Sequence, residues 1–425
     1  MLRAFVTAFR IPDLRRKLLF TLLIVLVYRV GAWIPIPGVD VAQLRDATAG
    51  AGAAQIVGII NVFAGGALQQ MAVFSLGIMP YITASIMMQL LAVVIPRLEE
   101  LQREGEQGRR QITQYTRYVT IGLALLQSSA LVTLAINGTA FGTNVMPGAG
   151  TGIVIVAVLT LTAGTSLIMW LGELITSRGI GNGMSLLIYV SIISQFPSEL
   201  SIVQTSNGWG WVAGVLAMGV LLTAGVVFME MGQRRIPVQY ARRQVGRRTY
   251  GGQSTYIPLK VNQSGVIPVI FASSLMFLPG LTAQLSGNEA LRTFTDEYLG
   301  NATNPVYLVV FATLTIFFAY FYSAITFNPV EVADNMQRYG GFVPGIRPGR
   351  QTAEHLDRIL TRITLPGSLY LAAIAILPFI LLAVGNIQAF PLGGVSLLIM
   401  VGVALQTAQQ VESQLLQRDY EGFIS

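Results

Sequence analysis

The sequence predicts an all-α integral membrane protein with ten transmembrane helices, arranged as two inverted five-helix halves around a central pore. Three observations lead to this prediction. Of the 425 residues, 53% are hydrophobic and only 11% are charged, whereas soluble domains carry about 25% charged residues. Apolar runs of spanning length recur along the chain, and two short motifs occur once in each half. The low charge density excludes a soluble enzyme.

The ten expected spans follow from the thickness of a bilayer. A membrane-crossing helix needs about 20 mostly apolar residues. The segments that meet this requirement are 18–36, 73–95, 118–136, 152–172, 183–202, 211–230, 264–283, 306–327, 366–385 and 392–411. We expect residues 1–202 to form the N-terminal half, with spans 1 to 5, and residues 203–425 to form the C-terminal half, with spans 6 to 10.

Basic residues are unevenly divided between the two sides of the expected membrane. Of the 27 Lys and Arg residues, 24 lie in the two tails and in the loops after spans 2, 4, 6 and 8. The opposite loops hold Arg45 and Arg292, and Arg29 lies within span 1. Loops rich in Lys and Arg stay in the cytoplasm. Both termini are therefore expected to be cytoplasmic, and the net charge of +7 signals orientation rather than nucleic-acid binding.

The N-terminal segment resembles a signal peptide at first, because Arg15, Arg16 and Lys17 precede an apolar run. The run continues through Trp33 to Pro37 without a small-residue cleavage site. We therefore expect a retained first span.

Residue usage also limits the chemistry of the chain. It has no cysteine and one histidine, His355, which excludes thiolate metal sites and disfavours imidazole-built ones. No phosphate-binding G-x-x-x-x-G-K-[ST] loop is present, and the glycines of RGIGNG (178–183) precede a span rather than follow a strand. We expect no catalytic residue, metal or cofactor. Energy for transport would come from a partner or a gradient.

Charged residues are nearly missing from the expected spans. None of the 20 acidic residues is central in a span, and Glu173 and Glu230 lie at the cytoplasmic ends of spans 4 and 6. Coupled transporters usually carry such residues in their spans, so a small-solute secondary transporter is disfavoured. A lipid-modifying enzyme is a weaker alternative, because it needs an acid/base pair or metal ligands. Arg29, about 16 Å into span 1, is expected to pair with backbone carbonyls or a polar neighbour.

Two motifs indicate an internal repeat. The pattern G-x-x-P-x-I-x-A-S occurs at 77–85 in span 2 and at 265–273 in span 7, and G-x-S-L-L-I occurs at 183–188 in span 5 and at 394–399 in span 10. Five helices per half is an odd number, so the second half would enter the membrane from the opposite side. Close helix packing through small residues is the alternative explanation of each motif.

We place the four motif-bearing helices around the central pore. The expected pore lining is aliphatic and consists of Ile78, Ile82, Met184, Ile188, Ile270 and Ile399. Such a constriction cannot select an ion by coordination, as rings of carbonyl or carboxylate groups do. It can exclude water and ions while deforming around something large and chemically varied.

Three loop segments stand out. On the outer side, residues 57–70 (VGIINVFAGGALQQ) are apolar but too short to span, so they form either a stopper for the pore or an interfacial helix. On the inner side, residues 230–262 and 328–365 are long connections, which are usually functional. Alternating Tyr and Thr predict a β-hairpin arm in the former, and FVPGIRPGRQT predicts a rigid turn that presents Arg347 and Arg350 in the latter.

Paired arginines bind phosphate or carboxylate groups. Three binding partners of these inner loops remain open on the residues alone: anionic lipid headgroups, ribosomal RNA and an acidic protein surface.

Seven segments of distinctive sequence follow one another along nearly the whole chain. They are YRVGAWIPIPG (28–38), NVFAGGAL (61–68), GIMPYITASI (77–86), EGEQGRRQITQYTRY (104–118), RGIGNGMSLLI (178–188), IPLKVNQSGVIPVIFASS (257–274) and NPVEVADNMQRYGGFVPGIRPGRQT (328–352). Together they resemble the SecY family of bacterial protein-conducting channels. The resemblance implies a channel that passes unfolded secretory polypeptides across the cell inner membrane, releases transmembrane segments into lipid and is not itself an enzyme.

The resemblance also implies roles for particular residues. The expected pore lining coincides with the family's pore ring, with Met184 where isoleucine is more usual. Residues 57–70 correspond to the family's plug, which includes Asn61, Phe63, Gly65 and Gly66. Spans 2 and 7 correspond to the lateral gate, which includes Pro80, Ser85, Pro268 and Ser273.

Partners are implied by the same resemblance. Arg242, Arg243, Arg247 and Arg248 in the first inner loop, and Arg347 with Arg350 in the second, would dock the ribosome and the SecA ATPase. SecE and SecG would be companion subunits, and a nascent or unfolded chain with a signal sequence would be the cargo. Anionic lipids and the accessory proteins YidC and SecDF complete the expected partners.

Overall fold

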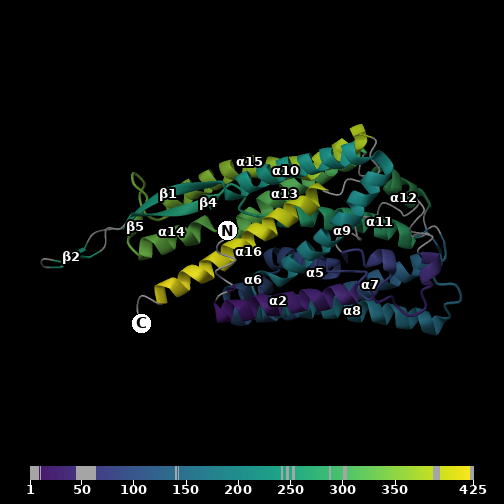
Figure 1. The fold of residues 1–425 in the computed structure, drawn as a ribbon. Coiled ribbons are helices and arrows are strands. Elements are labelled where there is room, and N and C mark those ends of the chain that lie inside the picture. Colours follow the sequence, from purple (N-terminus) through teal and green to yellow (C-terminus); the bar gives the residue numbers. More distant parts are fainter. Residues whose placement is uncertain are drawn as a thin grey trace.

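The computed structural model describes residues 9, 11–44, 64–138, 141, 143–240, 243–245, 248–250, 254–286, 289–299, 304–385 and 393–421. Long helices run roughly along one direction, and a small sheet projects from one end of the helical bundle (Figure 1). The described chain is mostly helical, as the sequence predicts.

The expected spans 1 to 5 correspond to five of the helices in the first half. The elements are α2 (Pro12–Gly31), the 3₁₀ turn η1 (Leu68–Gln70), α5 (Met79–Val94), α6 (Pro96–Arg103), α7 (Glu106–Ile136), α8 (Thr151–Arg178) and α9 (Gly183–Asn207).

The second half adds a sheet to its helices. Its helical elements are α10 (Trp209–Met231), α11 (Ile267–Ser286), α12 (Glu289–Phe294), the π turn η2 (Thr295–Leu299), α13 (Pro305–Thr326), α14 (Pro329–Arg338), α15 (Arg350–Gly385) and α16 (Gly394–Glu421). Its strands are β1 (Gln233–Tyr240), β2 (Arg243–Val245), β3 (Arg248–Tyr250), β4 (Ser254–Lys260) and β5 (Gly341–Phe342).

Seven helices of the described chain are long and apolar enough to cross a membrane: α7, α8, α9, α10, α13 together with α14, α15 and α16. An eighth span results if α5 and α6, which meet at a bend of 104°, are counted together. Helices α2 and α11 lie where the remaining two spans are expected. Their crossing of the membrane stays a prediction.

Several helices extend beyond their apolar segments. Helix α15 begins at Arg350 rather than near residue 366, and α14 occupies Pro329–Arg338, so the expected loop 328–365 is mostly helical. Sequence reasoning missed these helical turns because hydropathy marks only the part of a helix that suits a bilayer, and the cytoplasmic position of the segment stays a prediction. Residues 350–365 contain no Gly or Pro, and a helix continues through such a polar stretch.

The two repeated motifs adopt matching local structures. Gly77 and Gly265 both have a left-handed backbone, with φ of 55° and 61°. Each lies two residues before a helix whose second residue is proline. Glycine suits such a position because it has no Cβ to clash. In the second motif, Gly183 is the first residue of α9 and Gly394 is the first residue of α16.

Helix packing repeats in the same order. In the first half α5 packs against α7, α7 against α8 and α8 against α9, and in the second half α11 packs against α13, α13 against α15 and α15 against α16. The halves meet where α5 contacts α11 and where α9 contacts α16. Each of these meeting pairs carries the two copies of one motif. The division at residue 202 stays a prediction.

The expected hairpin arm is confirmed. Strands β1 and β4 pair antiparallel from Gln233 opposite Lys260 to Gln239 opposite Ser254, and β2 pairs with β3. Strand β5 adds to β1, giving the order β4-β1-β5. One hydrophobic cluster joins these strands to α14 and α15, and its buried residues are Ile236, Val238, Leu259, Met336, Val343, Leu356 and Ile359. We call β1, β4, β5, α14 and the first turns of α15 the sheet module.

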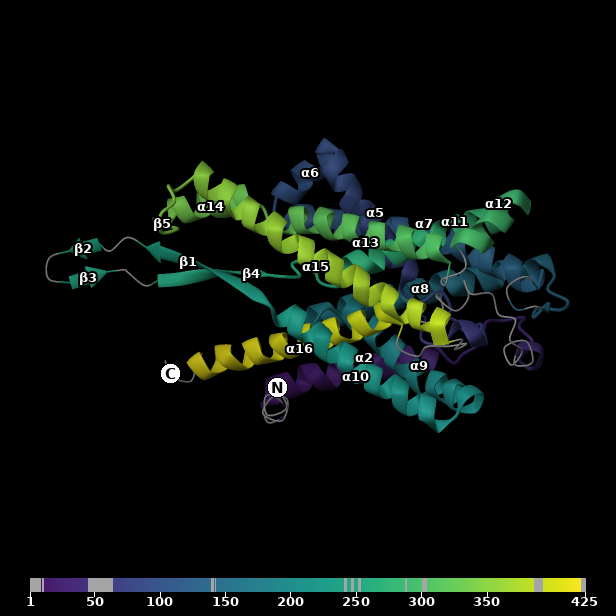
Figure 2. The same ribbon diagram turned by 90° about the horizontal axis from the view of Figure 1, so that it is seen from above.

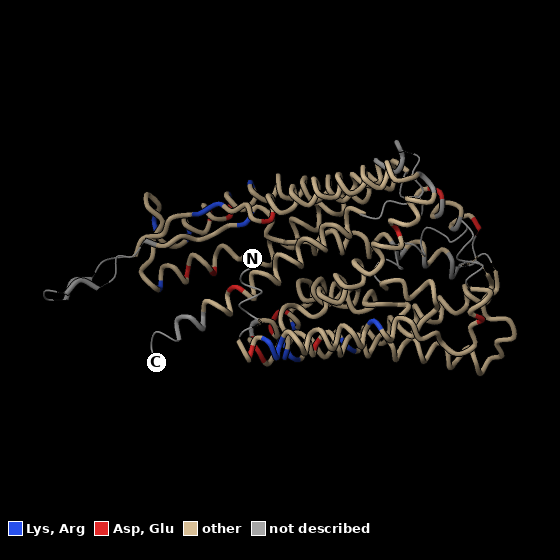
Figure 3. The backbone as a smooth tube through the Cα atoms, viewed as in Figure 1, with Lys and Arg blue, Asp and Glu red and all other residues tan. Residues whose placement is uncertain are grey.

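The sheet module lies at one end of the bundle in both ribbon views (Figure 2). Most described Lys and Arg residues gather at this same end, together with many acidic residues, whereas the charged residues drawn at the opposite end are acidic (Figure 3). The expected inner loops therefore do share one end of the molecule.

Candidate functional site

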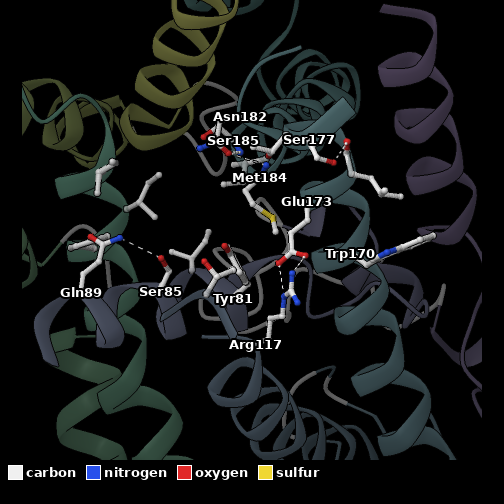
Figure 4. Close-up of a pocket in the computed structure, with 18 of the residues that line it drawn as sticks. Tyr81, Ser85, Gln89, Arg117, Trp170, Glu173, Ser177, Asn182, Met184 and Ser185 are labelled. Atoms are coloured by element: carbon white, nitrogen blue, oxygen red, sulfur yellow. Dashed lines mark hydrogen bonds and ion pairs between the residues drawn. The ribbon is translucent and has the colours of Figure 1, made fainter. Parts of the chain in front are cut away.

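A cavity of about 680 Å³ lies between the two halves (Figure 4). Its lining comes from six helices: Tyr81, Ile82, Ser85 and Gln89 of α5, Thr113 and Arg117 of α7, Trp170, Glu173, Leu174, Thr176 and Ser177 of α8, Met184, Ser185 and Ile188 of α9, Ile267, Ile270 and Phe271 of α11, and Tyr322 of α13, together with Asn182 at the start of α9. A space bounded by both halves is where a pathway between them would run.

Four of the six residues expected to line the pore lie on this cavity: Ile82, Met184, Ile188 and Ile270. Ile82, Ile188 and Ile270 are almost fully buried, and Met184 packs against the same core. The other two expected residues, Ile78 and Ile399, lie buried in that core but do not line the cavity. The structure therefore brings aliphatic side chains of three motif-bearing helices to one place.

The expected gate residues lie on the two helices that meet across the halves. Ser85 lines the cavity, and its Oγ accepts a hydrogen bond from Gln89 Nε2 at 3.3 Å. Ser273 Oγ donates to the Ile270 carbonyl at 2.9 Å. Pro80 and Pro268 are buried in the first turns of α5 and α11, where proline is tolerated because the first N–H groups of a helix have no partner in it.

The cavity wall also contains an ion pair that sequence reasoning missed. Arg117 of α7 donates to both carboxylate oxygens of Glu173 of α8, at 2.9 and 2.7 Å, and to Gln114 Oε1 at 3.0 Å. Figure 4 shows this pair facing the cavity. The only sequence signal was that both residues fall at the expected cytoplasmic ends of spans, which does not reveal a contact across 56 residues.

Asn182 positions the part of α9 that reaches the cavity. Its Oδ1 accepts hydrogen bonds from the backbone N–H groups of Met184 and Ser185 at 3.1 and 3.4 Å. These are N-cap bonds, which satisfy donors that the helix itself leaves unpaired. Met184 and Ser185 are thereby fixed at the edge of the cavity.

The expected plug is described in part. Asn61 and Phe63 lie outside the described residues, whereas Gly65 and Gly66 have left-handed backbones with φ of 65° and 85°. Ala64, Ala67 and Leu68 have no exposed surface and belong to the main core. Arg29 Nη1 donates to the Gly65 carbonyl at 2.9 Å and to Ser194 Oγ at 2.8 Å. This confirms the expectation that Arg29 pairs with a carbonyl and a polar neighbour.

The expected docking arginines that the structure describes lie at or beyond the sheet module. Arg347 and Arg350 are exposed, and Arg350 Nε binds Glu354 at 2.9 Å. Arg243 and Arg248 belong to β2 and β3, and Arg242 and Arg247 fall outside the described residues. Sequence reasoning missed that β1 pairs with β5, which joins both inner segments into one body.

In the described part of the chain, no group of three or more His, Cys, Asp or Glu side chains is placed to hold a metal ion.

Comparison with known proteins identifies the family to which this chain belongs. Residues 72–408 match the SecY family model. The chain belongs to the SecY family. The protein translocase subunit SecY of Streptomyces galbus is 55% identical over 436 residues, covering 100% of both chains.

Solved structures agree in fold. A SecY structure in which the plug domain stabilises the closed state of the translocation channel and maintains a membrane seal matches with a TM-score of 0.62 at 17% identity, covering 93% of this chain and 91% of that one. Sec61 in the canine ribosome–channel complex from the endoplasmic reticulum matches with a TM-score of 0.56 at 16% identity, with the same coverage. The SecY-family fold and the multi-pass membrane class follow.

Proposed function

We propose that this chain is the channel subunit through which unfolded secretory polypeptides cross the bacterial cell membrane. The observation that carries the proposal is the cavity between the halves, on which Ile82 and Ile270, equivalent residues of the repeated motif, both lie. Supporting it, the relative from Streptomyces galbus is named a protein translocase subunit.

In this proposal the aliphatic residues form the seal. Ile78, Ile82, Met184, Ile188, Ile270 and Ile399 would surround the narrowest part of the pathway. Apolar constrictions gate by excluding water, and flexible or branched aliphatic side chains adapt to varied chain segments passing through. The described plug residues would close the pathway from the outer side, and the complete burial of Ala64, Ala67 and Leu68 supports a stopper over an interfacial helix.

Helices α5 and α11 would form the lateral gate. They belong to different halves and touch each other, so separating the halves opens this contact toward the surrounding lipid. A sufficiently apolar segment of the passing chain would leave by this route. Pro80, Ser85, Pro268 and Ser273 lie on these two helices.

The sheet module and its arm would dock the driving partner on the cytoplasmic side. The clustering of basic residues at this end supports the orientation through the positive-inside rule. The canine Sec61 match is a channel in a ribosome complex, which favours a ribosome as one partner, with SecA as the other. SecE and SecG would complete the assembly. ATP hydrolysis or chain elongation by the partner supplies the energy, so the chain itself is not an enzyme.

Crosslinking of a stalled secretory chain tests this function. The chain has no cysteine, so single cysteines can be introduced at Ile82, Ile270 and Ile399. We expect all three to crosslink to a cysteine in the stalled segment. Leu159→Cys is the matched control, because Leu159 is 56% exposed on α8, away from the cavity. Equal crosslinking at position 159, or none at positions 82 and 270, would exclude the proposed path.

A further inference from the structure

The side chain of Arg29 joins three segments of the chain. It starts on α2, and its Nη1 donates to the Gly65 carbonyl of the plug segment at 2.9 Å and to Ser194 Oγ of α9 at 2.8 Å. Ser194 Oγ in turn lies 3.5 Å from the same carbonyl and donates to the Ser191 carbonyl at 2.7 Å. One charged group therefore links α2, the plug segment and α9.

The two hydrogen-bond partners of Arg29 in the described part of the chain are a carbonyl and a hydroxyl, not a carboxylate. Ion pairs among the described residues include those of Arg110 with Glu106, Arg117 with Glu173 and Arg350 with Glu354, and none of these three involves Arg29. A charged side chain within a span is costly unless it is paired or hydrogen-bonded. Among the described residues, the Gly65 carbonyl is thus one of two acceptors for this charge, and Arg29 favours the position of the plug segment that supplies it.

Gly65 is shaped for this contact. Its φ of 65° lies in the left-handed region, which favours glycine. A Cβ at this position would lie 3.0 Å from Ser191 Cα and 3.2 Å from Arg29 Nη1. The missing side chain therefore lets the backbone approach both α9 and the guanidinium.

The far end of the plug segment is held differently. Ile36 N–H donates to the Met71 carbonyl and Val73 N–H donates to the Ile34 carbonyl, both at 2.9 Å, next to a bridge between Pro35 and Ala72. These backbone bonds anchor the segment at its base. The contact at Gly65 depends on a side chain, so it can be released without breaking the anchor.

We propose that Arg29 is the latch that holds residues 64–68 against α9 while the pore is closed. On release of the plug, the guanidinium keeps Ser194 as an acceptor, which lowers the cost of opening. This inference rests on the proposed function of the plug segment, but the latch contact itself can be measured separately.

Hydrogen–deuterium exchange over residues 64–72 measures the latch directly, in the full chain reconstituted with its co-purifying subunits in lipid nanodiscs. Arg29→Met removes the charge and both hydrogen bonds. Loss of a hydrogen bond to a charged group corresponds to about tenfold to a hundredfold in an equilibrium, and we expect exchange to accelerate by that factor. Arg29→Lys keeps the charge and should restore part of the protection.

Tyr28→Phe is the matched control. Tyr28 precedes Arg29 on α2 and its hydroxyl bonds Ser191 Oγ of α9 at 2.6 Å, but no hydrogen bond joins it to the described plug residues. This variant loosens the same helix pair without touching the latch, so exchange over 64–72 should stay as in the parent. Exchange over α13 reports whether each variant is folded.

Ion leakage through liposomes that contain the same variants separates the latch from the proposed function. Faster exchange over 64–72 together with greater leakage in Arg29→Met supports both. Faster exchange with unchanged leakage keeps the latch but overturns the sealing role of the plug segment. Unchanged exchange in Arg29→Met, with α13 protected, overturns the latch.

Discussion

Gly183 and Gly394 occupy equivalent places in the two halves, each as the first residue of a helix that lies against the backbone of the preceding one. A Cβ on Gly183 would collide with the Gly172 carbonyl of α8, and a Cβ on Gly394 would collide with the Ile374 carbonyl of α15. The two copies of the sequence motif G-x-S-L-L-I therefore form the same packing arrangement, once in each half. Such contacts through small residues are typical of helix packing in membranes.

The first prediction concerns this contact. Gly183→Ala should destabilise the chain by about 1–3 kcal/mol, because overpacking against backbone cannot be relieved by a rotamer change. The lowering of the thermal unfolding midpoint in detergent measures this. Gly214→Ala in α10 is the control, since a Cβ there meets nothing within 4 Å. Alanine should leave that midpoint unchanged or raise it. Equal effects of the two variants would contradict the packing explanation.

A second prediction addresses the seal. Ile82→Asn or Ile270→Asn should increase ion leakage through reconstituted channels and relax the requirement for a functional signal sequence, because a polar side chain lets water into the constriction. Flux of a halide from liposomes measures the leakage, and Ile82→Val should remain tight.

Burying a polar side chain also costs about 1–3 kcal/mol of folding stability by itself. The leakage experiment therefore needs a control for this loss of stability. Leu397→Asn bears the same burial cost, since Leu397 is 1% exposed in the same core but does not line the cavity. Leakage from Leu397→Asn as large as that from Ile82→Asn would exclude the proposed pore-lining residues as the seal.

A third prediction concerns docking. Arg347→Glu should impair SecA-driven transport into vesicles while leaving folding within about 0.5 kcal/mol, as is usual for exposed positions. The turn itself does not depend on this side chain, because it is the Arg347 backbone carbonyl that accepts the Thr352 hydroxyl at 2.9 Å. Arg358→Glu, exposed on α15, makes the same charge change and should have a smaller effect. Normal transport by Arg347→Glu would rule out this docking role.

The fourth prediction concerns the wall of the cavity. A double-mutant cycle with Arg117→Met and Glu173→Gln should give a coupling of about 1 kcal/mol, since the pair is bidentate but partly exposed, at 40% and 25% of the two side chains. Chemical denaturation of the four variants measures this coupling. The Arg110–Glu106 pair, exposed at 79% and 82%, is the matched control and should show no measurable coupling. Similar coupling energies for both pairs would mean that the position of Arg117 and Glu173 in the cavity wall does not strengthen their interaction.

The fold class could be predicted from the sequence because each membrane span is recognisable from the hydrophobicity of one contiguous segment. An apolar run such as 211–230 must be a helix in lipid, since only a helix satisfies every backbone N–H and C=O within one segment. The hairpin arm was likewise predictable from the alternating Tyr and Thr residues of the polar run 238–260. The polar ends of α15 and α16 were not, because a drop in hydropathy marks where a helix leaves the lipid rather than where the helix ends.

By itself, the sequence determined the helical membrane class, the basic end of the bundle, the internal repeat and the aliphatic character of the lining. Only the tertiary structure decided which of those residues meet. It placed Ile82 and Ile270 on one cavity and Ile399 in the hydrophobic core. It also paired Arg117 with Glu173 and placed the Gly65 carbonyl where Arg29 donates a hydrogen bond to it. The physical reason is that composition reports the solvent each segment prefers, whereas contacts between distant segments depend on how helices cross and pack.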